Sequence, residues 1–235
     1  MNAKEKVVDY IKVFVYAILA GVCISMGGIA YLSCENVVVG ALFFCVGLFI
    51  ILNFNFNLFT GKVCYVFNND WRYSIKVVII LLGNFVGANL LALCLRLTRL
   101  VSLQERCSQI VANKLSDGLL SLFVLGVFCN ILIYVAVEGF KSENVLTKYL
   151  SLFFGVATFV ICGFEHSVAD MFYFAFAGEY SGQMFLALLV VILGNCVGGV
   201  FIELIKKLFE KKTNCINNPN YISCIKYFIC DKTCF

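Results

Sequence analysis

Four uninterrupted apolar runs constrain this chain more than any other feature. Each approaches the roughly 20 apolar residues that an α-helix needs to cross the hydrocarbon core of a bilayer. The runs are Val13–Leu32, Val77–Leu95, Leu119–Val137 and Met184–Ile202. Only 14% of the residues are charged, whereas soluble domains carry roughly 25%. The sequence therefore predicts an all-α integral membrane protein, and it excludes a soluble enzyme, a nucleic-acid-binding protein and a disordered segment.

Two further apolar segments are interrupted by polar residues. Val37–Leu52 is followed by an asparagine-rich stretch before the apolar pattern resumes at Leu58, and Tyr149–Cys162 by a short polar stretch before it resumes at Val168. Non-helical backbone at membrane depth is tolerated only where protein buries it or where it lines a cavity. We therefore expect six transmembrane helices, the second and fifth broken around an internal pathway.

The chain also repeats a short motif. The segment Leu82–Gly87, with the sequence LGNFVG, returns in the sixth span as Leu193–Gly198, LGNCVG. A repeat of three spans is odd in number, so the second copy enters the membrane upside down. The pattern thus predicts an inverted 3+3 repeat, in which the small residues either serve close helix packing or also shape the pathway.

The basic residues predict how the chain lies in a cytoplasmic membrane. If the N-terminus is cytoplasmic, 14 of the 18 Lys and Arg residues fall on that side, as the positive-inside rule requires. Both termini are then cytoplasmic. We expect a cytoplasmic N-terminal segment at 1–12, a six-helix transmembrane domain at 13–208 and a cytoplasmic Cys-containing tail at 209–235.

The 13 cysteines do not predict a disulfide framework. They are odd in number and mostly scattered singly through apolar runs, where a thiol acts as a small hydrophobic group. The tail cysteines could instead bind metal or be palmitoylated, but the tail offers no histidine as a further ligand. We expect no metal site and no cofactor.

One cluster of ionisable residues lies at membrane depth, in the break of the fifth span. It contains Glu165, Asp170 and His166, the single histidine of the chain. Such groups are costly in a membrane and usually mark a pathway, a proton relay or a buried pair. His166 is therefore a pathway residue, a hydrogen-bonded core residue or, least favoured because no second ligand is near, a metal ligand. We expect Glu165 to cap backbone N–H groups where the helix resumes.

Residues around the other break complete a candidate pathway. Thr60 could donate a hydrogen bond to an anion or to His166, or it could be an ordinary helix N-cap. Large apolar side chains near the two breaks either pack the core or form rings above and below a polar chamber. They are Phe44, Leu48, Leu58 and Phe159.

These motifs resemble one membrane protein family. Residues 163–169, GFEHSVA, and residues 58–61, LFTG, together with Leu-Gly-Asn in the third and sixth spans, are similar to the formate/nitrite transporter family, which includes the hydrosulfide channels. The resemblance covers about residues 13–208. It implies an aquaporin-like fold, assembly as a homopentamer, and a separate pore in each subunit.

The resemblance also implies roles for single residues. His166 matches the central histidine of the family and Thr60 its second-span threonine. Lys114, sixteen residues before Asn130, matches a lysine that draws anions inward, and both are expected to line the substrate pathway. The two hydrophobic constrictions match Leu48 and Phe159, with Phe44 and Leu58 adding to them.

Two positions depart from the family pattern. Asn57 stands where the family commonly has an acid, and Asp170 where it has an asparagine. We expect that an acid and an amide have been exchanged between the halves, with both side chains close together near the pore. An extra carboxylate there disfavours anions or raises the pKa of the histidine.

The implied function is a channel or proton-coupled permease for small monovalent anions, formate or nitrite. A hydrosulfide channel is the first alternative, and an aquaporin-like pore for neutral solutes is the second. The sequence has no second histidine, nucleophile elbow or phosphate-binding glycine loop, so we do not expect an enzyme. The expected partners are small anions, protons and the lipid bilayer.

Overall fold

The computed structural model describes residues 3–216, and within this range every regular element is a helix. The elements are α1 (Ala3–Leu32), α2 (Val37–Phe54), α3 (Phe59–Val63), η1 (Val66–Asn68), α4 (Trp71–Arg96), η2 (Arg99–Leu103), α5 (Gln104–Ser116), α6 (Leu119–Gly139), α7 (Val145–Ile161), α8 (Ser167–Ala177) and α9 (Gly182–Ile216). Helices α1 and α9 run through the predicted boundaries at 12/13 and 208/209. Residues 217–235 of the predicted tail lie outside the described residues.

Five of the described helices are long and apolar enough to cross a membrane: α1, α2, α4, α6 and α9. Four of them contain the uninterrupted runs of the sequence. The fifth, α2, has 18 residues and meets the length requirement alone, although we expected it to need its continuation beyond the asparagines. Helix α7 is one residue shorter than α2.

Close contacts between backbones hold the long helices in pairs, α1 against α4 and α6 against α9. A Cβ atom added to Gly87 of α4 would collide with the carbonyl oxygen of Ile18 in α1. In the other pair, a Cβ on Gly198 of α9 would collide with the carbonyl oxygen of Val127 in α6. The glycines of the repeated motif therefore serve helix packing, one of the two roles considered for them.

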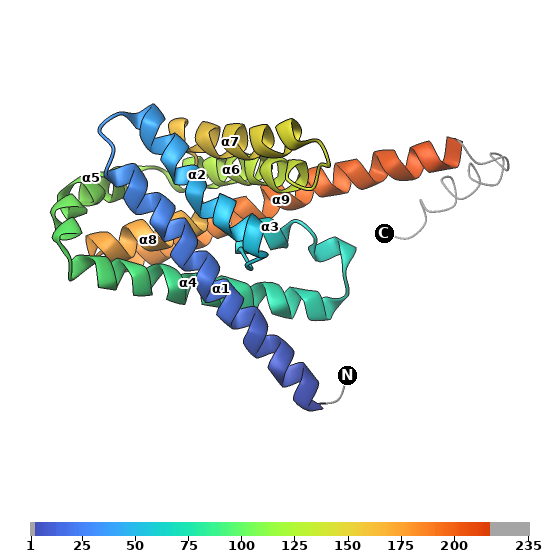
Figure 1. Ribbon diagram of the computed structural model, residues 1–235, viewed down its shortest axis with the longest axis horizontal. Helices are drawn as coiled ribbons and strands as arrows, with labels where there is room; N and C mark the ends of the chain where they lie inside the picture. Colours follow the sequence, from blue (N-terminus) through green and yellow to red (C-terminus); the bar gives the residue numbers. More distant parts are fainter. Residues whose placement is uncertain (1–2, 217–235) are drawn as a thin grey trace.

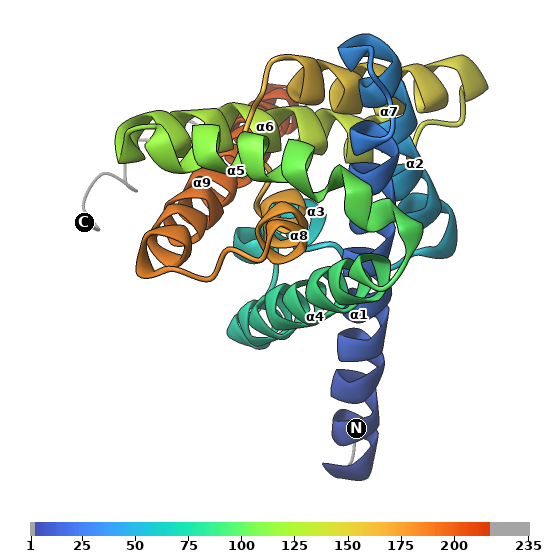
Figure 2. The same cartoon turned by 90° about the vertical axis from the view of Figure 1, so that its left-hand side faces the viewer.

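The short helices α3 and α8 lie at the centre of the bundle, enclosed by the long ones (Figure 2). Every residue of α8 from Ser167 to Phe176 is buried. The chain leaves α2 through Asn55 and leaves α7 through Gly163, with φ angles of 55° and 66°. Asparagine and glycine are the residues that adopt this left-handed conformation most readily.

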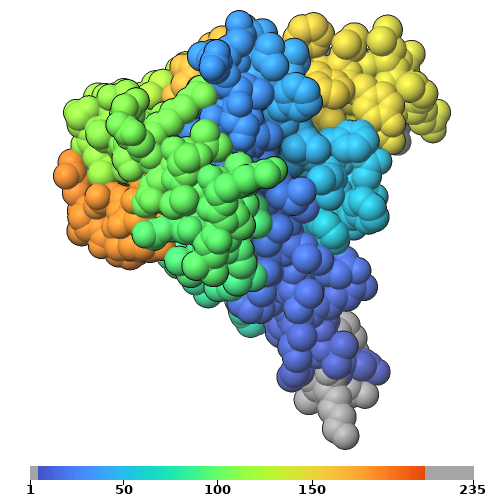
Figure 3. Space-filling view, turned by 60° about the vertical axis from the view of Figure 1, so that its left-hand side comes forward, coloured from blue at the N-terminus to red at the C-terminus, as the bar shows by residue number. Residues whose placement is uncertain are grey.

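Helix α5 has no counterpart among the six predicted spans. It lies across one end of the molecule, while the α3–α4 connection and the C-terminal end of α9 lie at the other (Figure 1). Figure 3 shows α5 on the surface of the molecule. Its buried residues Cys107 and Val111 are four apart, on one face of the helix. Lys114 follows on the same face and is carried inward.

Candidate functional site

Two asparagines of the repeated motif hold the two interrupted segments in the same way. Asn84 accepts a hydrogen bond from the N–H of Phe59, the first residue of α3, and its amide donates to the carbonyl oxygens of Ala17 and Asn57. Asn195 accepts from the N–H of Ser167, the first residue of α8, and donates to the carbonyl oxygens of Gly126 and Glu165. Backbone groups that a helix leaves unpaired at its start are thereby satisfied without water.

His166 is the N-cap of α8, and this role fixes where its proton lies. Its Nδ1 accepts a hydrogen bond of 3.1 Å from the backbone N–H of Ala169. A nitrogen that accepts carries no proton, so the neutral imidazole has its proton on Nε2. A protonated imidazole would carry a hydrogen on Nδ1 as well. That hydrogen would face the N–H of Ala169 and break the capping hydrogen bond. The geometry thus favours a neutral ring with a donor at Nε2.

Nε2 of His166 lies 3.1 Å from the hydroxyl oxygen of Thr60, on α3. Leu58, not Thr60, is the N-cap residue of α3. Of the roles considered for Thr60, the contact with His166 is therefore the one present, and both side chains are fully enclosed. Because Nε2–H donates to the Thr60 oxygen, the hydroxyl proton of Thr60 is free to donate to a third group.

Aromatic rings cover the histidine on one side. The ring of Phe159 stacks on the imidazole, with centroids 5.5 Å apart and an interplanar angle of 15°. Phe44 meets Phe159 edge to face at 5.8 Å. These contacts place Phe159 directly beside His166, with Phe44 behind it.

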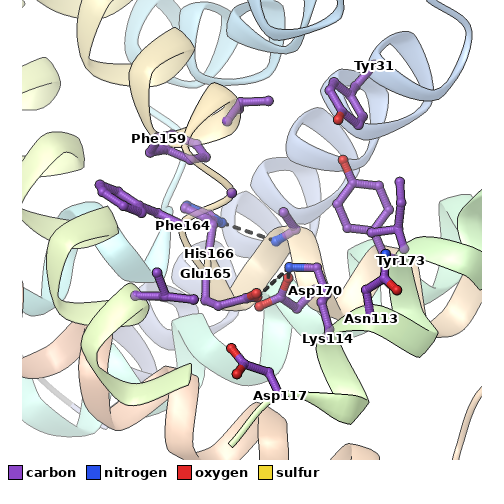
Figure 4. Close-up of a pocket in the computed structure, with 15 residues that line it drawn as sticks. Tyr31, Asn113, Lys114, Asp117, Phe159, Phe164, Glu165, His166, Asp170 and Tyr173 are labelled. Atoms are coloured by element: carbon purple, nitrogen blue, oxygen red, sulfur yellow. Dashed lines mark hydrogen bonds and ion pairs between the residues drawn. The ribbon is translucent and has the colours of Figure 1, made fainter. Parts of the chain in front are cut away.

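Two cavities approach this pair from different elements. The first, of about 300 Å³, is lined by His166 and Phe159 together with residues of α5 and α8 (Figure 4). The second, of about 210 Å³, is lined by Leu48, Leu58 and residues around α3. Three of the four predicted constriction residues therefore line a cavity, Phe159 the first and Leu48 and Leu58 the second, whereas Phe44 lines neither and contacts Phe159. His166 lines the first cavity, and Thr60 lines neither.

Lys114 does not present a free charge to the first cavity. Figure 4 shows its ammonium between two carboxylates, Glu165 and Asp170. The Nζ–Oδ1 distance to Asp170 is 3.0 Å. Burial alone would lower the pKa of Lys114, but the two carboxylates raise it above its usual value. The lysine stays charged at neutral pH, and its charge is matched within the protein.

This ion cluster corrects one expectation and changes another. The carboxylate of Glu165 pairs with Lys114 and does not cap α8, because His166 occupies the cap position. Lys114 was expected to draw anions inward, yet Asp170 and Glu165 already hold it. The cluster joins α5, the loop before α8 and α8 itself.

Asn57 and Asp170 do not form the expected neighbouring pair. The amide of Asn57 donates to the carbonyl oxygen of Val13 in α1, and Asp170 pairs with Lys114. Each side chain thus has its own partner, so the predicted exchange of an acid and an amide across the pore is wrong. Asp170 remains beside the first cavity, whereas Asn57 lines neither of the two cavities described above.

Asn130 is also displaced from its expected place in the pathway. Its amide donates to the carbonyl oxygen of Asn195 at 2.7 Å, between α6 and α9, and it lines neither cavity. Its side-chain oxygen has no partner among the described residues. The position therefore belongs to the packing of the two helices.

Several residues of the site escaped the sequence analysis. Asn84 and Asn195 had a visible signal, because an amide recurs at the same point of two apolar spans and a buried amide needs partners. The other missed residues line the first cavity from α1, α5, α8 and the α5–α6 loop, and sequence alone does not bring them together. They are Tyr31, Asn113, Asp117 and Tyr173.

Comparison with known proteins supports the fold. A solved pentameric formate channel with formate bound matches with a TM-score of 0.74 at 25% identity, covering 89% of this chain and 99% of that structure. A solved ion channel of the FNT family matches with a TM-score of 0.73 at 22% identity, covering 85% and 90%. Both likenesses extend over most of each chain.

Sequence comparison gives the same family. An uncharacterized transporter of Bacillus subtilis, YrhG, is 29% identical over 184 residues, which are 71% of this chain and 69% of the relative. The formate channel FocB of Escherichia coli is 24% identical, covering 80% and 83%. The family model described as formate/nitrite transporter matches residues 2–207. The chain therefore belongs to the formate/nitrite transporter family.

Proposed function

We propose that this protein is a membrane channel for small monovalent weak-acid anions, formate or nitrite. The observation that carries the proposal is the enclosed Thr60–His166 pair, with His166 in the wall of the first cavity and the chain neighbours of Thr60, Leu58 and Gly61, in the wall of the second. Membership of the family and the similarity to formate channels support it. The chain would act as a conduit, with no chemical conversion of the anion.

The proposed architecture is an aquaporin-like inverted repeat with six crossings. In it, α2 with α3 and α7 with α8 form the two broken spans. The matching hydrogen bonds of Asn84 and Asn195 support this equivalence, because each asparagine joins the third helix of its half to the first helix and to the break. The two breaks then meet at Thr60 and His166.

The central pair would let an anion cross an apolar passage by losing its charge. An isolated charge in a dry apolar medium faces a penalty of tens of kcal/mol. A weak-acid anion that takes up a proton avoids this penalty. In our proposal, Nε2–H of His166 donates to the Thr60 oxygen and the Thr60 hydroxyl donates to the anion, so that the pair orients the anion, while the proton reaches the anion from solution through water in the cavity. The capped, neutral imidazole is suited to donating a hydrogen bond, not to releasing a proton.

The proposed setting is the cytoplasmic membrane, with both termini on the cytoplasmic side and five subunits in the assembly. The distribution of 14 of the 18 basic residues supports the orientation. The similarity to a solved pentameric channel supports the homopentamer. Each subunit would hold its own pore, as both cavities lie within one chain.

Flux into proteoliposomes tests the proposal. Formate, nitrite, hydrosulfide and glycerol are compared by stopped flow, with and without an inwardly directed proton gradient. We expect formate and nitrite to enter, and the gradient to increase their rate because protonation accompanies passage. Glycerol is expected not to enter above the rate of empty liposomes.

Each alternative has its own outcome. Rapid entry of hydrosulfide with no entry of formate or nitrite would make the protein a hydrosulfide channel. Entry of glycerol that ignores the proton gradient would make it a neutral-solute pore. Thr60→Val, which removes the hydroxyl at nearly constant volume, is expected to slow formate entry, whereas Thr60→Ser keeps the hydroxyl and serves as the matched control.

A further inference from the structure

The two cavities differ in the charge of their walls. The first is lined by one cation, Lys114, and three carboxylates, those of Asp117, Glu165 and Asp170. The second is lined by two cations, Lys62 and Lys141, and no carboxylate lines it among the described residues. An anion is therefore repelled at the first wall and attracted at the second.

Lys62 is the distinctive residue of the second cavity, which we call the α3 chamber. It lies on α3, two residues after Thr60, and its side chain is half-buried. Within residues 3–216, no carboxylate lies at ion-pair distance from its ammonium, and no side chain accepts a hydrogen bond from it. Tyr73 fixes the lysine backbone by donating its hydroxyl to the Lys62 carbonyl at 2.9 Å.

The other cation of the chamber, Lys141, already has a partner. Lys141 pairs with Glu138 and donates to the Tyr65 hydroxyl at 3.0 Å. The same Glu138 also pairs with Lys206, at 2.8 Å. Lys62 is therefore the cation of the chamber wall that has no carboxylate partner among the described residues. A partly buried cation without a counter-ion is costly, and an anion from solution would relieve that cost.

The chamber has the size and position for such an anion. Its volume is about 210 Å³, and a water occupies about 30 Å³ of liquid, so a small anion fits with several waters. Leu48 and Leu58 form the wall toward the central pair, while Asn55 and Tyr65 supply polar groups. The chamber lies near the α3–α4 connection, at the end of the molecule opposite α5 (Figure 1).

We propose that the α3 chamber is an anion-binding site for a small monovalent carboxylate or oxyanion, and that Lys62 is its principal ligand. The site gathers anions at this end of the pathway before they reach Leu48 and Leu58. At the other end, Lys114 has a structural role, because its own carboxylates neutralise it. This inference rests on the proposed anion pathway, but binding is measurable without transport.

Binding of ¹³C-formate to the full-length, detergent-solubilised protein tests the site. Titration followed by NMR line broadening gives the half-saturating formate concentration. We expect Lys62→Gln to raise this concentration at least fivefold and Lys62→Arg to leave it within twofold. The matched control is Lys76→Gln, which removes a lysine already paired with Asp9 at 2.7 Å and outside the chamber.

A second variant covers the possibility that Lys62→Gln does not fold. Asn55→Asp leaves the lysine in place and adds a carboxylate to the chamber wall, at a left-handed position that aspartate tolerates. It is expected to weaken formate binding as strongly as Lys62→Gln. Asn53→Asp, an exposed position that does not line the chamber, is the charge-matched control.

The outcomes separate this inference from the proposed function. Formate binding that Lys62→Gln and Asn55→Asp leave unchanged, or no binding to the unmodified protein, overturns the chamber site even if formate enters liposomes. Binding that depends on Lys62, in a protein that does not transport formate, supports the chamber site and overturns the proposed function.

Discussion

The two ring nitrogens of His166 make different contacts. Nδ1 caps α8 and Nε2 contacts Thr60. A substitution can therefore remove one contact or both. We expect stability to depend on Nδ1 and transport to depend on Nε2, so the two effects can be measured separately.

His166→Asn and His166→Phe should differ in stability and agree in transport. Asparagine is a favoured N-cap, whereas phenylalanine has no acceptor for the Ala169 N–H, so the Phe variant should be less stable by about 1 kcal/mol. Both variants lose the Nε2–H donor and should carry formate more slowly than the unmodified protein. Unfolding in detergent and stopped-flow flux measure the two effects. Equal stability of the two variants would argue against the cap.

Lys114→Met should destabilise the protein by about 3–5 kcal/mol, because it leaves two buried carboxylates without a cation. Lys114→Arg keeps the charge and should cost much less. The triple variant Lys114→Met, Glu165→Gln, Asp170→Asn removes every charge of the cluster and should recover most of the loss. Unfolding of the purified variants checks this series, and no recovery in the triple variant would contradict the ion cluster as the cause.

The pKa of Lys114 sets how this stability depends on pH. A raised pKa in the folded state means that the contribution is fully present below the unfolded value of 10.5 and is lost only as pH rises through the folded value. Titration of Lys114 itself should therefore not change the stability gap between the unmodified protein and Lys114→Met from pH 6 to pH 9. A gap that closes within this window would show that another group titrates.

Only some of the contacts of these residues could be predicted from the sequence. His166, Glu165 and Asp170 are close in sequence, so their cluster was visible. Lys114, the partner of Glu165 and Asp170, is 51 residues from Glu165, and only the resemblance brought it into the site. Because the sequence gives no sign that α5 folds back over α8, the lysine looked free when it is paired.

At the scale of elements, the broken segments depend on side chains more than on their own helix propensity. Helix α3 has five residues and no side-chain cap of its own. Isolated helices shorter than about 12–15 residues are marginal in water. Burial and the asparagine of the repeated motif must therefore hold it in place.

Asn84→Ala and Asn195→Ala should each lower stability markedly and to a similar extent. Each change leaves buried backbone groups unpaired, and each unpaired group costs about 1–3 kcal/mol. Asn89→Ala, an amide on α4 that contacts Phe85 of its own helix and Tyr180, is the control and should cost less. Thermal unfolding of the three variants gives the comparison, and a loss as large for Asn89→Ala would contradict the special role of the motif.

Most of the helices were predictable because apolar length is a strong signal in a membrane chain. Four runs lie within long helices, and the two polar interruptions lie where helices end and restart. Helix α5 was missed because its composition is polar, and only one face contacts the bundle. A short amphipathic helix has a weak signal beside runs of about 20 apolar residues.

For the whole molecule, the outer surface carries rows of exposed apolar side chains that lipid or other subunits must cover. Rows with a spacing of three to four residues run along α4 and α9, the two helices that carry the repeated motif. The row on α4 contains Val78, Leu82, Val86, Leu90 and Leu93, and the row on α9 contains Phe185, Leu189, Leu193, Val197 and Phe201.

The purified protein should have a native mass of about five times the 26.2 kDa subunit. Large apolar surfaces stay out of water when subunits pack against one another, and a solved relative of similar fold is pentameric. Native mass spectrometry from detergent measures the mass, and chemical cross-linking of membranes provides an independent check. A mass of one or four subunits would contradict the pentamer.

The hydrogen bond between Thr60 and His166 also connects two parts of the fold. Thr60 stands on a segment that Asn84 clamps to α1, and His166 borders a segment that Asn195 clamps to α6. Any sliding of one clamped unit against the other must change the Thr60–His166 distance. The contact between Thr60 and His166 is therefore also a joint of the fold, and the distance between the two side chains reports whether the two units are aligned.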